Sequence, residues 1–221
     1  MSVVHEYESH VPSHPKIKDD SLNGKIMEAI VNNNPKYLRS LCRKCECSVL
    51  SNLDFLSEAV KNTKDGRTVD VLLDCGCAKS RQGVEPYAIT CVRSNPRVAT
   101  IEALAKHNVS INVSSFNGTP VVVEALQLGR GLDIIESLVR HKASVVSGDV
   151  NGNTPLHVLL REGYNHHRDL VDIAKLLLGH GANPGAPNRA HVTPRRLFEL
   201  QRERGAIPED KATWLRSLLE V

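Results

Sequence analysis

The stretch from Asn151 to Asn188 constrains the fold more than any other part of this 221-residue chain. It opens with an Asn-Gly pair, which favours a tight turn because glycine adopts positive φ at little cost. Thr154 can then cap a helix that has Pro155 at its first position, where a missing N–H leaves no hydrogen bond unmade. A second apolar helical run ends at Leu178, and Gly181 suits the left-handed residue that follows such a helix. One helix pair of this kind cannot bury its own apolar face, so the pattern predicts neighbouring copies.

The same pattern recurs along the chain and becomes weaker towards the N-terminus. Its helix starts lie near Gly24, Asp54, Glu85, Thr119, Thr154 and Thr193, which gives spacings of 30, 31, 34, 35 and 39 residues. The longest spacing reflects an insertion at residues 164–169, between the two helices of the fifth copy. We therefore predict six stacked copies over residues 21–221, preceded by a flexible arm over residues 1–20.

The end of the last copy predicts a capping helix over residues 208–221. Trp214, Leu215, Leu218 and Leu219 recur there at helical spacing, whereas the opposite face of the helix is charged. This pattern predicts that Trp214 belongs to the core.

Two motifs in the fifth copy resemble an ankyrin repeat: Thr154-Pro155-Leu156-His157, and Leu176-Leu177-Leu178 followed by Gly181-Ala182. The resemblance implies an all-α helical solenoid with β-turn fingers between the copies. It also implies that His157 ties a finger to a helix by hydrogen bonding. The composition, 41% hydrophobic but only 4% aromatic, fits helical repeats filled with aliphatic residues better than it fits a β-sandwich.

Other classes of function lack their signatures in this sequence. It has no glycine-rich phosphate loop, no HExxH and no GxSxG motif, so we predict a non-catalytic protein without a cofactor. The net charge of +3 is too small to favour nucleic acid, and no apolar run reaches the ~20 residues that span a bilayer. Six cysteines without a secretory signal indicate free thiols in a reducing compartment. We expect a monomer in the cytoplasm or the nucleus.

The resemblance implies a protein or peptide partner, because ankyrin arrays bind mainly through finger tips and the exposed face of their inner helices. Placed by register, the family's variable positions give the predicted partner contacts. They are Arg81, Gln82, Arg93, Ser115, Phe116, Asn117, Gln127, Val150, Asn151, Asn153, Arg161, Glu162 and Arg189. Phe116 stands out among them because aromatic residues and arginine dominate interface energies.

Two alternatives remain open at the level of the sequence. Cys45, Cys47, Cys75 and Cys77 come from equivalent helix ends of adjacent copies and could form a tetrahedral zinc site or a redox-responsive cluster. The same cysteines could instead fill small apolar positions that other copies give to glycine, alanine or serine. The chain could also be the ankyrin portion of a larger protein whose activity lies elsewhere.

Overall fold

The computed structural model describes residues 21–44, 54–77, 83–94, 96–162 and 169–220. Within these residues the chain forms twelve α-helices and no strand beyond an isolated bridge between Ser114 and Pro120. The helices are α1 (Leu22–Val31), α2 (Pro35–Cys42), α4 (Phe55–Asn62), α5 (Arg67–Asp74), α6 (Tyr87–Arg93), α7 (Val98–Lys106), α8 (Val121–Gln127), α9 (Leu132–Arg140), α10 (Pro155–Glu162), α11 (Leu170–Gly179), α12 (Pro194–Glu203) and α13 (Glu209–Leu219). The predicted arm over residues 1–20 and most of the predicted insertion at 164–169 lie outside the described residues.

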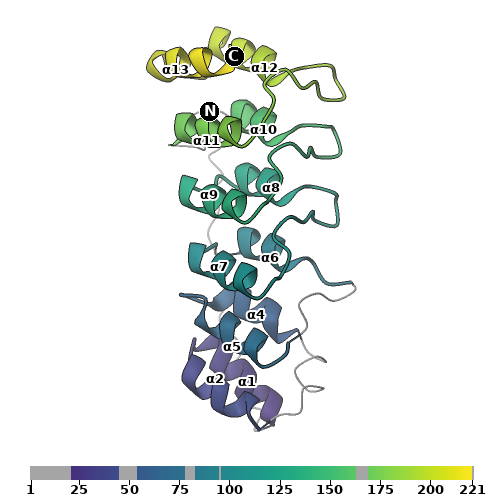
Figure 1. The fold of residues 1–221 in the computed structure, drawn as a ribbon, viewed down its shortest axis with the longest axis vertical. Helices are drawn as coiled ribbons and strands as arrows, with labels where there is room; N and C mark the ends of the chain where they lie inside the picture. Colours follow the sequence, from purple (N-terminus) through teal and green to yellow (C-terminus); the bar gives the residue numbers. More distant parts are fainter. Residues whose placement is uncertain (1–20, 45–53, 78–82, 95, 163–168, 221) are drawn as a thin grey trace, which may run out of the picture.

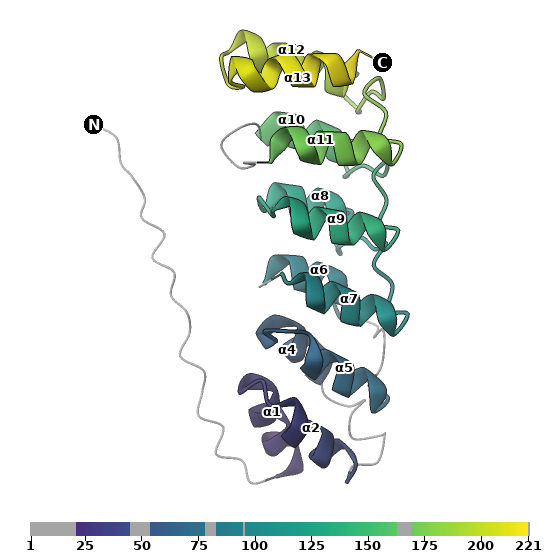
Figure 2. The same ribbon diagram turned by 60° about the vertical axis from the view of Figure 1, so that its left-hand side comes forward.

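Six antiparallel helix pairs are stacked along one long axis, and the loops that join α7 to α8, α9 to α10 and α11 to α12 project to one side (Figure 1). The first helices of the pairs form an inner layer on the side of these loops (Figure 1). The second helices form an outer layer, which lies in front of the inner layer for α7, α9, α11 and α13 in Figure 2. Each inner helix packs on the inner helix of the next pair, from α1 on α4 to α10 on α12. The prediction of an all-α helical solenoid is confirmed.

The core runs without interruption through the stack, because the same helical positions are apolar in every pair. Leu72, Leu104, Leu138 and Leu177 occupy equivalent places on successive outer helices, and all four side chains are fully buried. The first and second pairs, whose sequence signals are weakest, join the same cluster through residues such as Ile30 and Phe55.

The prediction that Trp214 belongs to the core is wrong. Its side chain is 62% exposed, and Lys175 Nζ lies 5.6 Å from the centre of its ring. Helix α13 packs on α11 and α12 through Ala212, Leu215 and Leu219, all of which are buried. Trp214 lies beside this buried stripe and faces solvent.

His157 ties α10 to the following finger, as the sequence predicts. The amide of Thr154 donates to its Nδ1 over 3.2 Å, so Nδ1 is an acceptor and the proton of the neutral ring is on Nε2. Nε2 in turn donates to the carbonyl of Val192, at 2.9 Å. Burial is the main influence on the ring and lowers the pKa of His157 below its usual value, while the Val192 carbonyl opposes this shift.

We predict that His157 makes stability depend on pH below about 6.5, the ordinary histidine pKa. Because the folded-state pKa is lowered, the unfolded chain binds more protons, and stability falls as the pH drops through that value. Thermal melts at pH 7.5 and 5.5 should show a smaller pH effect for His157→Gln than for the wild type. His191→Gln, at an exposed histidine, is the control variant. If His157→Gln showed the same pH effect as the wild type, the assignment would be contradicted.

Candidate functional site

Three successive loops end in fingers with the same turn, formed by residues 115–119, 149–153 and 188–192. In each turn the amide of the fourth residue donates to the carbonyl of the first, over 2.8, 2.8 and 3.0 Å in chain order. The amide of the first residue donates to the carbonyl of the fifth, over 2.9, 3.1 and 3.0 Å in the same order. The fourth residue has positive φ in all three, at 75° for Gly118, 75° for Gly152 and 57° for His191. The fingers therefore present their tips in equivalent geometry.

The first residue of each turn stabilises the finger with its side chain. Asp149 Oδ1 accepts the amides of Asn151 and Asn153, at 2.8 and 2.9 Å. Asn188 Oδ1 accepts two amides of its own finger in the same way, each over 3.0 Å. Ser115 Oγ accepts the amide of Thr119, at 3.2 Å. These bonds fix the backbone of the tips before any partner arrives.

Two of the predicted partner contacts, Ser115 and Asn153, have buried side chains that hydrogen-bond within the fingers. Ser115 is 5% exposed and Asn153 is 8% exposed. The Asn153 amide group donates to Asp149 Oδ2 over 3.1 Å, and its Oδ1 accepts from Asn188 Nδ2 over 2.8 Å. Sequence register placed both residues in the fingers but could not show that their side chains point inward.

The second residue of each turn points away from the fold. Phe116 is 67% exposed and Val150 is 55% exposed, and Arg189 at the equivalent place is exposed as well. Adjacent elements hold these tips in place: the Phe116 amide donates to Glu85 Oε1 at 3.2 Å, and the Arg189 amide donates to the Asn151 carbonyl at 3.0 Å. Together these residues form a row of tips along one edge of the solenoid.

Among the predicted partner contacts on the inner helices, one forms ion pairs within the fold and others are exposed. Arg93 Nε lies 2.7 Å from Glu124 Oε1 and its Nη1 lies 3.3 Å from Glu85 Oε1, and the hydrogen bond to Glu124 raises the pKa of Arg93 most. Gln127 and Arg161 are exposed at the ends of α8 and α10, as are Asn117 and Asn151 at the finger tips. Arg81, Gln82 and the side chain of Glu162 lie outside the described residues.

Of the two described cysteines of the cluster, Cys77 is buried and Cys75 is half-buried. Burial raises the pKa of Cys77 to about 12, with smaller contributions from Cys75 and Asp54. Metal binding and nucleophilic attack both need the thiolate, which such a pKa disfavours. Within the part of the chain that the structure describes, no three His, Cys, Asp or Glu side chains are grouped to hold a metal. Cys45 and Cys47 lie outside that part, so the full cluster remains a hypothesis.

None of the described helices is long and apolar enough to cross a membrane.

Comparison with known proteins supports the resemblance seen in the sequence. The family model for the ankyrin repeat matches residues 151–189. The ankyrin repeat protein FPV228 of Fowlpox virus (strain NVSL) is 30% identical over 118 residues, which cover 48% of this chain and 22% of that protein. The chain therefore matches only about a fifth of the length of this relative.

Two solved structures share the fold at low sequence identity. The crystal structure of EF0377, an ankyrin repeat protein, superimposes with a TM-score of 0.69 at 18% identity, over 89% of this chain and 96% of that chain. The ankyrin repeat domain of Bcl-3, a member of the IkappaB protein family, gives a TM-score of 0.51 at 17% identity, over 80% and 97% of the two chains.

The reactivity of the cysteines tests whether the buried ones only fill the core or act as reactive thiols. We predict that N-ethylmaleimide at pH 8 labels the half-buried Cys75 well before Cys77 and Cys91, whose pKa values burial raises to about 12 and about 11. At that pH only about one Cys77 in ten thousand would be a thiolate. Peptide mass spectrometry of native and denatured protein measures the rates, and rapid native labelling of Cys77 would contradict the packing role.

Proposed function

We propose that this chain, which matches the ankyrin repeat model over residues 151–189 and shares the ankyrin fold, binds a protein or peptide partner through its finger tips and the adjoining inner-helix ends. Ankyrin repeats are in general protein–protein interaction modules. The observation that supports this surface most directly is the exposure of Phe116 and Val150 at equivalent tips. Because these side chains are exposed, they contribute little hydrophobic free energy to folding. Burial against a partner would remove their apolar surface from water and would favour binding.

Phe116 and Val150 belong to neighbouring fingers that touch. A methyl group added at Gly118, two residues from Phe116, would lie 3.5 Å from Val150 Cγ1. Val150 therefore lies against the finger that displays Phe116, and Arg189 continues the row on the next finger. An aromatic anchor with a nearby arginine has the composition that dominates the binding energy of many interfaces.

The rigidity of the fingers also favours recognition. Hydrogen bonds within each turn and between neighbouring elements already order the tip backbone. Binding therefore loses less conformational entropy than it would at a flexible loop. We infer a non-catalytic adaptor, scaffold or regulator that acts in the cytoplasm or the nucleus.

We predict that Phe116→Ala combined with Val150→Ala weakens partner binding about tenfold or more, since an anchor of this kind contributes ~2 kcal/mol. Affinity purification with quantitative mass spectrometry would identify proteins recovered by the wild type and depleted by the variant. Titration of the purified partner would then give the change in Kd.

Trp214→Ala is the matched control, because Trp214 is 62% exposed on α13, on the side of the solenoid away from the fingers (Figure 1). It should recover the same proteins as the wild type. A set of recovered proteins that is identical for all three chains would exclude the finger tips as the binding surface.

A further inference from the structure

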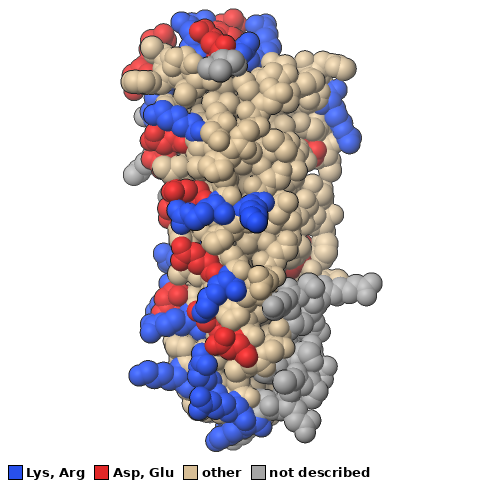
Figure 3. Space-filling view, viewed as in Figure 1, with Lys and Arg blue, Asp and Glu red and all other residues tan. Residues whose placement is uncertain are grey.

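The first helix pair carries an excess of positive charge that no other described pair shows. Residues 21–44 contain five Lys or Arg side chains and one acid, Glu28, whereas residues 54–77 contain three Lys or Arg and five acids. Figure 3 shows the Lys and Arg side chains gathered at the lower end of the molecule, over α1 and α2. This end of the solenoid is remote from the apolar finger tips.

Helix α2 presents most of this charge on one face. Lys36, Arg39 and Arg43 follow one another at intervals of three and four residues, so they lie along one side of the helix, and all are exposed. Tyr37, which is 40% exposed, and Ser40 lie next to them. The other side of α2 carries Leu38, Leu41 and Cys42, all of which are buried in the core.

The effect of these cations on the stability of α2 explains the positions of only some of them. Arg43 lies at the C-terminus of α2, where a cation interacts favourably with the helix dipole. Lys36 lies in the first turn, where the same dipole makes a cation unfavourable, and that turn has no acid. The helix dipole therefore does not explain the position of Lys36.

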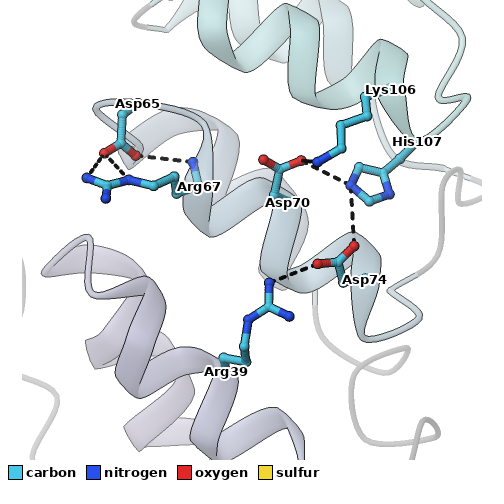
Figure 4. A network of polar contacts seen from close by, with 7 residues as sticks. All are labelled: Arg39, Asp65, Arg67, Asp70, Asp74, Lys106 and His107. Atoms are coloured by element: carbon cyan, nitrogen blue, oxygen red, sulfur yellow. Dashed lines mark hydrogen bonds and ion pairs between the residues drawn. The ribbon is translucent and has the colours of Figure 1, made fainter.

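A shallow depression of about 280 Å³ adjoins this face, between α2, α5 and α7. Its two acids are already engaged (Figure 4): Asp74 Oδ2 lies 2.9 Å from Arg39 Nη2, and Asp70 Oδ1 lies 3.1 Å from Lys106 Nζ. His107 Nε2 lies 3.0 Å from Asp70 Oδ1 and 3.7 Å from Asp74 Oδ1. The depression is lined by Pro35, Lys36, Arg39, Arg67, Asp70, Val71, Asp74 and Lys106.

We propose that the exposed face of α2 and this depression form a second docking surface, which binds a short acidic segment of a partner protein. The cations on α2 supply charge complementarity, and Tyr37 supplies an amphipathic contact. The basic face is short, since the eight residues of α2 span only ~12 Å. A short acidic segment matches this length, whereas a long polyanion such as nucleic acid or an anionic membrane would extend beyond the cations of α2.

The test uses the full chain labelled with ¹⁵N and a synthetic twelve-residue peptide of glutamate, aspartate and leucine. We expect the amide shifts to concentrate in residues 35–44 and 67–74 and at Lys106, and the affinity to fall as salt increases. Shifts at the finger tips, or none, would overturn the proposal. So would tighter binding at this face by single-stranded RNA or by phosphatidylserine vesicles.

Charge reversal supplies the second arm of the test. Lys36→Glu with Arg43→Glu should weaken peptide binding about tenfold, because attraction becomes repulsion at two positions. The matched control is Arg196→Glu with Arg204→Glu, which makes the same change in charge in the first turn and at the C-terminal end of α12. Equal weakening in both variants would mean that only the net charge matters and would reject a site on α2. Circular dichroism confirms that each variant is folded, and Lys36→Gln with Arg43→Gln should give an intermediate affinity.

Discussion

Every helix pair in this protein depends on its neighbours to bury its apolar face. Helix α4 packs between α1 and α6, and the same relation carries through α8 to α10 and α12. One apolar cluster consequently extends through the described solenoid, although no single pair contains enough surface for a core of its own. The stack also sets the spacing of the loops, so the row of finger tips is a product of helix packing. Recognition at one edge of the molecule thus depends on contacts in its interior.

Much of this architecture could be predicted from local sequence signals. Pro155 begins α10 and His157 bonds the next finger, because both act through neighbouring backbone groups. The cysteines and inner-facing polar residues were harder, since their roles depend on where each side chain points. Lys142 shows the limit: it has φ of 67° where the pattern favours glycine, so packing imposes a conformation that its own preference opposes.

Trp214 and the basic face are two further features that the sequence patterns did not predict. Helical periodicity identifies residues that share a face, but it does not give the width of the surface that covers them. Helix α13 is covered along Ala212, Leu215 and Leu219, and Trp214 falls just outside. Overall charge is similarly uninformative: a net value of +3 conceals a first pair that is strongly basic beside a second that is acidic. The exposure of Trp214 emerges only when the helices are placed in space, whereas the charge difference becomes visible once residues are counted pair by pair.

The shared turn of the three fingers separates the residues that shape a tip from the residue that the tip displays. Ser115, Asp149 and Asn188 hold the turns, while Phe116, Val150 and Arg189 make the outward display. The displayed residues are an aromatic, an aliphatic and a charged side chain, yet the backbone hydrogen bonds beneath them are the same. Recognition can therefore diversify by single substitutions at these places without a cost in folding, which makes the row of tips an evolvable part of an otherwise constrained chain.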